Sequence, residues 1–382
     1  MQLTEDQRLV RDSVRAYVQD NVAPMAAAWD KSHAFPAAEL KGLAALGCYG
    51  IAVPDEYGGA GLDYAALAII VEEIAAGDGG VSTVISVNNC PVCSIMMSFA
   101  SEAQKRDYLV PLARGDMLGA FALTESHAGS DASSLRTTAT LDGDHYVLNG
   151  AKQFITSGKN ADVAIVMAVT DKAAGKRGIS AFLVPTKTPG YTVARIEDKL
   201  GQHSSDTAAL LFENCRIPMS LRIGEEGAGY KIALAGLEGG RIGIAAQSVG
   251  MARAAFEAAL RYANEREAFG KTIFEHQAVQ FKLADMATQI EAARQLTHHA
   301  ASLKDAGQPC LTQAAMAKLF ASEMAERICS DAIQIHGGYG YVADFPVERI
   351  YRDVRVCQIY EGTSDIQKIL IGRGLASGTY DT

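Results

Sequence analysis

Apolar residues change their spacing along the chain and divide it into three stretches. Up to about residue 118 they recur every three or four positions, which is the period of an amphipathic helix. Thr4 with Gln7 forms a capping box ahead of the first run, and Ser101 with Gln104 forms another. Further helices are predicted at about 37–46, 63–76, 81–99, where Pro91 is able to break the run, and 102–113.

Residues 119–222 show short runs of β-branched and aromatic residues separated by polar turns. Asp142-Gly143-Asp144 is typical of the turn of a hairpin. The spacing of the runs suits a small sandwich or barrel. Strands are predicted at 120–123, 137–141, 146–148, 163–169, 179–184, 191–196 and 208–212.

Helical periodicity returns after Gly227-Ala228-Gly229 and continues to the end of the chain. Helices are predicted at about 229–265, 276–305, 312–336, 347–354 and 364–375. The long ones carry apolar stripes and are expected to pack side by side as a bundle. The order of elements predicts an α+β multidomain protein with an N-terminal helical domain (1–118), a middle β domain (119–228) and a C-terminal helical bundle (229–382).

Composition describes an ordinary globular protein. The chain has 382 residues, of which 48% are hydrophobic and 21% charged, enough to bury a large core. A net charge of -9 with scattered basic residues argues against nucleic acid or an anionic membrane as the main partner. No apolar run reaches transmembrane length, and the start Met-Gln-Leu-Thr-Glu-Asp-Gln is polar and acidic rather than basic. We therefore expect a cytoplasmic protein with no membrane insertion.

Cysteine and histidine usage adds little chemistry. Seven cysteines, an odd number, fit reduced thiols better than a disulfide framework. Cys90-Pro91-Val92-Cys93 has the spacing of a redox motif, but it lies in an apolar stretch that also suits buried packing thiols. The eight histidines form no metal pattern, so no metal is expected. Glycine-rich dinucleotide, P-loop and G-x-S-x-G motifs are absent from the sequence.

One stretch near the C-terminus, Ile359 to Gln367, combines groups that can do chemistry. Glu361 follows an apolar pair, and Gly362 lets the backbone turn. Thr363-Ser364-Asp365 can then cap a new helix and direct N–H and hydroxyl groups at an anion. The alternative is a plain loop glutamate ahead of an ordinary helix cap.

Four motifs together resemble the acyl-CoA dehydrogenases, a family of FAD-dependent enzymes, over about residues 5–375. The likeness is to the short-chain and short branched-chain members. The motifs are the stretch around Glu361, Leu46 to Gly59, Leu123-Thr124-Glu125 with Gly129-Ser130-Asp131, and Gln334 to Gly340. The resemblance implies a helical domain, a β domain and a C-terminal four-helix bundle.

The resemblance also implies roles for individual residues. Glu361 is the catalytic base, and the neighbouring residues that meet the substrate are Ser130, Glu238, Arg241, Tyr360 and Gly362. Around the flavin lie Phe121, Leu123, Thr124, Gly129, Ser130, Phe154, Ile155, Thr156, Thr363, Ser364 and Asp365. The pyrophosphate and adenosine half is met by Arg266, Phe269 and Gln277, and by Gln334, Ile335, Gly337 and Gly338, which come from a neighbouring subunit. A homotetramer built as a dimer of dimers is therefore expected.

Three departures from the family pattern bear on these roles. Ser126-His127 stands where Pro-Gly is usual, which puts the conformation of that loop in doubt. Phe154 replaces the usual tryptophan, so an aromatic face is kept and an indole donor is lost. Glu238 is a rival for the base, because one branch of the family carries its acid on this helix. In that branch the acid immediately precedes the arginine, where this chain has Gly240.

The reaction implied is FAD-dependent α,β-dehydrogenation of a short-chain, straight or 2-methyl-branched, acyl-CoA to a trans-2-enoyl-CoA. It would serve fatty-acid β-oxidation or branched-chain amino-acid breakdown, and electrons would pass to electron-transfer flavoprotein. Medium-chain activity and an acyl-CoA oxidase are alternatives. A helical scaffold that binds acyl-CoA or flavin without catalysis is an alternative of another class.

Overall fold

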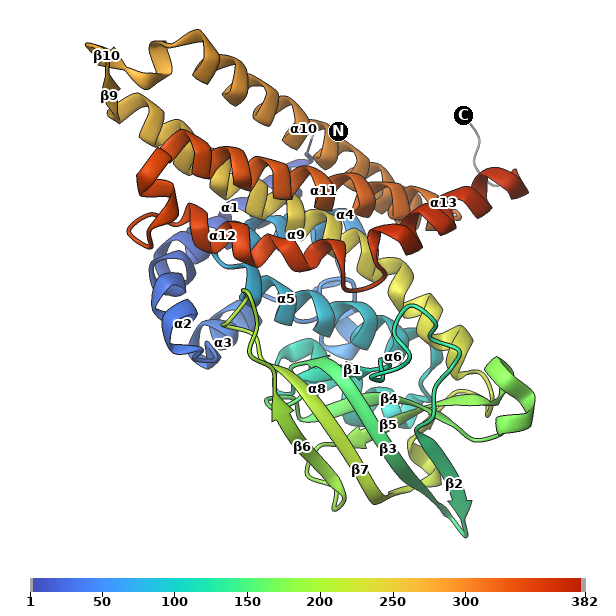
Figure 1. Cartoon of the computed structure of the whole chain (residues 1–382). Coiled ribbons are helices and arrows are strands. Elements are labelled where there is room, and N and C mark those ends of the chain that lie inside the picture. Colours follow the sequence, from blue (N-terminus) through green and yellow to red (C-terminus); the bar gives the residue numbers. More distant parts are fainter. Residues whose placement is uncertain (1–2, 379–382) are drawn as a thin grey trace.

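The computed structural model describes residues 3–378, which form a helical region, a sheet and a second helical region in chain order (Figure 1). Both predicted capping boxes are present, at Thr4 and Ser101. The N-terminal helices are α1 (Glu5–Tyr17), α2 (Ala26–Ser32), α3 (Ala37–Ala45), α4 (Tyr64–Gly77), α5 (Gly79–Val87), α6 (Ser94–Phe99), α7 (Glu102–Gln104) and α8 (Val110–Arg114).

Two features of the N-terminal region differ from simple helical periodicity. The run predicted at 81–99 is broken, because Cys90 leaves helical geometry (φ -138°, ψ 116°) immediately before Pro91. Helix α2 was not predicted, and it buries Trp29 against the core. Its sequence, Ala26 to Ser32, has one large apolar residue and so carries no readable stripe.

The eight strands form one mixed sheet in the order β6-β7-β3-β2-β4-β5-β8, and β1 pairs in parallel with β4. The predicted Asp142–Asp144 turn joins β2 to β3, with Gly143 at φ +64°. The strands are β1 (Gly119–Ala122), β2 (Thr138–Asp142), β3 (His145–Thr156), β4 (Val163–Val169), β5 (Ile179–Pro185), β6 (Tyr191–Ile196), β7 (Thr207–Pro218) and β8 (Arg222–Ile223).

The sheet folds over on itself between β2 and β4, which are joined only at Thr138 and Val169. As a result the two halves share one apolar core, in which the rings of Tyr146 on β3 and Phe182 on β5 meet edge to face at 4.8 Å. The other face of β4 and β5 packs against α6, α8 and α9 through residues such as Ile165. The β domain therefore has the sandwich-like form that the sequence predicts.

The C-terminal region is dominated by three long helices that pack side by side (Figure 1). They are α9 (Gly229–Glu265), α10 (Gln277–Asp305) and α11 (Leu311–His336), followed by α12 (Val347–Val354) and α13 (Ser364–Ser377). A short ribbon of β9 (Glu267–Ala268) and β10 (Lys271–Thr272) joins α9 to α10. With 37 residues, α9 spans about 55 Å at 1.5 Å per residue.

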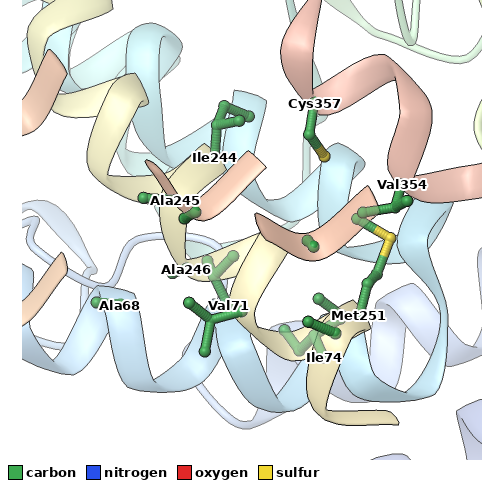
Figure 2. Close-up of a cluster of buried hydrophobic side chains, with 14 of the residues drawn as sticks. Ala68, Val71, Ile74, Ile244, Ala245, Ala246, Met251, Val354 and Cys357 are labelled. Atoms are coloured by element: carbon green, nitrogen blue, oxygen red, sulfur yellow. The ribbon is translucent and has the colours of Figure 1, made fainter. Parts of the chain in front are cut away.

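Helix α9 also ties the bundle to the N-terminal domain. Figure 2 shows where α4, α9 and α12 meet in one buried apolar cluster, with Val71, Ala245 and Val354 among its members. Gly250 permits the close approach, because a β-carbon there would lie 2.2 Å from the carbonyl oxygen of Glu72. The position of α9 relative to α4 is thus set by backbone contact.

Within residues 3–378, the stretch Gly79–Phe99, which includes the irregular backbone at Cys90, is long and apolar enough to cross a membrane, so the expectation that no apolar run reaches that length is wrong. It is 89% buried inside the protein, as expected of a core element. Cys90 and Cys93 lie in this run, and all seven cysteines are buried free thiols, which confirms the packing interpretation of that pair.

Candidate active site

The Glu361 turn joins α12 to α13 and has an unusual backbone. Glu361 has φ +52° and Gly362 has φ +95°, so two consecutive residues lie in the left-handed region. A glutamate rarely adopts this conformation, and it persists only where the surroundings impose it. The hydroxyl of Thr363 accepts a hydrogen bond from the N–H of Ile366 at 3.3 Å, which confirms the predicted cap of α13.

Buried polar side chains hold this turn on both sides. The carbonyl of Gly362 accepts hydrogen bonds from the Lys318 ammonium and from Gln367 Nε2, the latter at 2.8 Å. Neither Lys318 nor Gln367 has exposed surface. On the other side, the Tyr360 hydroxyl donates to Gln247 on α9. These contacts fix the backbone at the two residues that flank Glu361.

The Glu361 carboxylate is desolvated and unpaired. Its Oε2 atom is buried and has no hydrogen-bond partner. Burial raises the pKa of Glu361 to about 7, against the opposing effect of the positive charges of Lys318 and Arg241. Arg241 on α9 is itself buried, and its Nε and Nη1 atoms also have no partners. An acid and two cations thus converge without closing into ion pairs.

Gly240 of α9 faces this carboxylate, and its neighbour Gly239 faces Tyr64 and Cys90. A β-carbon at Gly240 would lie 2.1 Å from Glu361 Oε2, and one at Gly239 would lie 3.2 Å from Cys90 Sγ. The rival acid Glu238 is already paired, since Lys304 Nζ donates to its Oε1 at 2.8 Å. The acid that the alternative branch of the family would carry at Gly240 has no room beside Glu361.

The predicted flavin loop, Phe121 to Ser130, is anchored to β3 by a buried ion pair. Lys152 Nζ donates to Glu125 Oε1 at 2.8 Å and to the carbonyl of Leu123 at 2.9 Å. Burial lowers the pKa of Lys152 to about 8. The loop ends in Gly129 and Ser130, which are exposed.

Phe154 lies beside that loop. The N–H of its neighbour Gln153 donates to the carbonyl of Thr124 at 2.9 Å, so the two predicted flavin motifs are adjacent. Phe154 itself has φ +58° and is 62% exposed, whereas Ile155 is buried and Thr156 is half-buried. An exposed aromatic face next to small polar residues can stack against a flat heterocycle.

The Glu361 turn is also connected to the β domain. Gln202 of the β6–β7 connection donates its side-chain N–H to the carbonyl of Asp353 at 3.1 Å. Thr83 on α5 donates to Gln202 Oε1 at 2.7 Å and lies 3.5 Å from the Tyr360 hydroxyl. The Glu361 turn therefore lies where all three regions of the chain meet.

Four of the remaining predicted residues lie elsewhere, in a groove of about 670 Å³ beside the C-terminal end of α9. Arg266, Ile335, Gly337 and Gly338 line it together. Gln277 and Gln334 are exposed, and Phe269 is 97% exposed. Arg266 and the segment predicted to come from a neighbouring subunit thus lie together in one chain, so the expected division of these two segments between subunits is wrong. Gly240 lies about 39 Å back along α9 from Arg266.

Comparison with known proteins places this architecture in a family. The family description "Acyl-CoA dehydrogenase, N-terminal domain" matches residues 4–116, "Acyl-CoA dehydrogenase, middle domain" matches 120–215, and "Acyl-CoA dehydrogenase, C-terminal domain" matches 227–376. The chain belongs to the acyl-CoA dehydrogenase family. The resemblance seen in the sequence motifs is thereby confirmed, together with the fold that it implies.

Among acyl-CoA dehydrogenases, the similar members include short-chain enzymes. The human mitochondrial short-chain specific acyl-CoA dehydrogenase is 48% identical over 97% of this chain and 90% of that protein. The structure of butyryl-CoA dehydrogenase from Megasphaera elsdenii is 42% identical, with a TM-score of 0.96 over 98% of this chain and 99% of that one. A chain in the structure described as electron transferring flavoprotein of Acidaminococcus fermentans is 47% identical, with a TM-score of 0.96 over the same shares.

Several residues that contact the candidate site were missed from the sequence. Lys318 and Gln367 contact the Glu361 turn, and Lys152 with Glu125 anchors the flavin loop. The available signal was weak: Lys318 is a single charged residue in a mostly buried part of α11, whereas Lys152 lies in a strand whose neighbouring residues are exposed or half-buried.

Proposed function

We propose that this protein catalyses FAD-dependent α,β-dehydrogenation of short-chain acyl-CoA thioesters, with Glu361 as the base. One observation carries the proposal: Glu361 is half-buried, and its Oε2 atom is buried, has no hydrogen-bond partner and lies against Gly240, where the absence of a side chain leaves room for it. A surface loop glutamate would be solvated and free to move. Only within a substrate site does a desolvated, unpaired carboxylate have a use that offsets its cost.

Glu361 would remove the α proton of the bound thioester. A carboxylate whose pKa burial raises to about 7 is a stronger base than a solvated glutamate and is still substantially ionised at neutral pH. The family resemblance assigns the backbone N–H of Glu361 to the developing enolate oxygen, and such a donor is worth roughly 3–4 kcal/mol. Arg241 has two unpartnered nitrogens and would contact the CoA portion of the substrate. The acyl group would be surrounded by Ser130, Glu238, Tyr360 and Gly362.

The residues present fit FAD. Phe154 offers an exposed ring, Gly129 and Ser130 offer an exposed small-residue loop, and the Ser364 hydroxyl beside Glu361 is buried without a partner. Phe121, Leu123, Thr124, Ile155, Thr156, Thr363 and Asp365 would complete the flavin half. When bound, FAD supplies the acceptor for the β hydrogen, which leaves as hydride.

The cofactor site would need two copies of the chain. Arg266, Phe269, Gln277 and the segment Gln334 to Gly338 would hold the pyrophosphate and adenosine half, because guanidinium and exposed glycine N–H groups suit phosphates. Their groove lies too far along α9 from Gly240 for one FAD to reach both places in one chain. The groove would therefore serve the flavin of a neighbouring subunit, in a homotetramer built as a dimer of dimers, with domain boundaries after residues 118 and 228.

The preferred substrate would be short, such as butyryl-CoA or a 2-methyl-branched analogue. Two glycines of α9 let neighbouring side chains come close to the helix. A β-carbon at Gly239 would lie about 3 Å from Tyr64 and Cys90, and one at Gly243 would lie 2.6 Å from Ser86 Oγ. These close contacts narrow the space next to Glu361. The electron acceptor would be electron-transfer flavoprotein, in cytoplasmic fatty-acid or branched-chain amino-acid breakdown. The similar butyryl-CoA dehydrogenase structure supports the short substrate, and the similar chain in the electron transferring flavoprotein structure supports the electron acceptor.

The test is anaerobic bleaching of the purified yellow protein by a panel of acyl-CoAs. We expect fastest bleaching with butyryl-CoA or a short branched thioester, and slower bleaching at medium chain length. Fastest bleaching by a medium-chain substrate would contradict the length assignment, and a colourless protein that takes up no FAD would contradict the enzyme assignment. Turnover with electron-transfer flavoprotein and little hydrogen peroxide in air would separate a dehydrogenase from an oxidase.

A further inference from the structure

Lys318 is an unusual lysine, because it lies on α11 with no exposed surface. It is surrounded along the helix by small buried residues, including Ala314, Ala315 and Ala321. Burial lowers the pKa of Lys318 to about 8, which shows how unfavourable the charged form is at this position. A buried ammonium is normally satisfied by a carboxylate, but the partner of Lys318 is the carbonyl oxygen of Gly362.

That contact places the ammonium beside the base. Gly362 directly follows Glu361, and the negative charge of Glu361 is the largest opposing influence on the pKa of Lys318. The influence is reciprocal, since Lys318 is the foremost charge that lowers the pKa of Glu361 against burial. Arg241 also acts on Glu361, but its unpartnered nitrogens are assigned to the substrate in the function proposed above.

We propose that Lys318 is a positioning residue for the base: its ammonium holds the left-handed Glu361–Gly362 turn from within the bundle, and its charge offsets the desolvation of the Glu361 carboxylate. This inference deepens the proposed function and rests on it for the role of Glu361. Two separable effects are involved, a hydrogen bond to a carbonyl and a positive charge.

Gln367 makes these two effects distinguishable. Its Nε2 atom donates to the same Gly362 carbonyl at 2.8 Å and to the Glu361 carbonyl at 3.4 Å, but it carries no charge. Loss of Gln367 therefore weakens the turn without changing the charge around the carboxylate. Loss of Lys318 weakens the turn and also removes a positive charge near the carboxylate.

The experiment compares Lys318→Met with Gln367→Leu, and with Lys282→Met as a control. Lys282 pairs with Asp331 on the outer part of the bundle, away from the Glu361 turn. In substrate-free protein, the Glu361 carboxylate is titrated by infrared spectroscopy with ¹³C-labelled glutamate, and the same variant carrying Glu361→Gln identifies its band. The pH profile of kcat/KM for butyryl-CoA is measured in parallel.

We expect Lys318→Met to raise the titration midpoint of Glu361, and the acid limb of the pH profile, by about one pH unit or more. Gln367→Leu should lower the rate at every pH without moving the limb, and Lys282→Met should change neither. If Lys318→Met folds poorly, Lys318→Gln removes the charge and keeps a donor, and the same upward shift is expected. A uniform loss of rate with an unmoved midpoint would show that Lys318 is only structural.

The infrared titration requires no turnover, so its result stands apart from the proposed reaction. If Lys318→Met shifts the titration midpoint of Glu361 but no acyl-CoA bleaches the flavin, the electrostatic coupling of Lys318 to Glu361 is supported and the dehydrogenase function is rejected. An unshifted midpoint in an active enzyme would reject the inference and keep the function.

Discussion

Gly240→Ala should affect catalysis and stability in opposite directions. The added methyl group would start 2.1 Å from Glu361 Oε2, whereas ordinary van der Waals contact begins at 3.4 Å. The carboxylate must therefore retreat by about 1.3 Å. Misplacing a reacting group by about 1 Å can cost about a hundredfold in rate, so flavin reduction by butyryl-CoA should slow by at least about that factor.

Folding should respond in the opposite direction. Gly240 lies inside α9, where alanine is favoured over glycine by about 1 kcal/mol. The group that must move is the flexible end of a side chain, so the clash costs little. We expect the free energy of unfolding to be unchanged or to rise by up to about 1 kcal/mol.

The assay is anaerobic stopped-flow reduction of the flavin, with urea unfolding of the same preparations. Gly372→Ala on α13 is the matched control, because a β-carbon there meets nothing within 4 Å. The control should gain helix stability and keep full activity. A Gly240→Ala protein that reduces its flavin at the wild-type rate would refute the placement of Glu361 against α9.

Four further predictions follow from the charges and burial of named groups. Because burial raises the pKa of Glu361 to about 7, the pH profile of kcat/KM should fall about tenfold per unit below that pH as the base becomes protonated. The same raised pKa means that the folded state holds this proton more tightly than the unfolded state, so stability is lost as pH rises from 4.5 to about 7; Glu361→Gln should therefore unfold at higher urea than wild type at pH 8, and this advantage should vanish at pH 4. Lys152→Met leaves the buried Glu125 carboxylate without its cationic partner and should therefore lower the free energy of unfolding by about 3–5 kcal/mol in urea titrations. An unchanged urea midpoint would contradict the role of this ion pair. The Arg266→Ala protein should bind FAD more weakly in equilibrium dialysis, and its circular dichroism spectrum should show an intact fold. Undiminished FAD affinity would contradict the assignment of this groove to the cofactor site.

The sequence predicts the long elements of this fold well, because their apolar periodicity extends over many turns. The predicted bounds 229–265 agree with α9 to the residue, and those of the short helix α12, 347–354, also agree. The sequence predicts strand β3 only at 146–148, but the strand runs to Thr156. The alternation of buried and exposed residues is interrupted because the pairing register with β7 shifts twice, near Gly150 and beyond Lys152. Such irregularities are imposed by pairing with β7 and leave no periodic signal in β3 itself.

The site was predicted where its chemistry is contiguous in sequence. Glu361, Gly362 and the Thr363 cap lie in one turn, and local rules describe them. Lys318 contributes from a helix some forty residues earlier, and nothing in its own stretch indicates that its ammonium ends at the Gly362 carbonyl. Gly240 could be recognised as a missing acid, but the reason that glycine is needed there is visible only from the packing of α9 against the turn.

Glu361 is proposed to remove a proton from the substrate, and single-turnover flavin reduction by the Glu361→Gln protein is the decisive test of that role. The amide keeps the shape of the side chain and cannot act as a base. We predict a folded, yellow protein that binds butyryl-CoA and whose flavin stays oxidised under anaerobic conditions. Reduction at a near wild-type rate would contradict the account and move the base to Glu238 or another carboxylate.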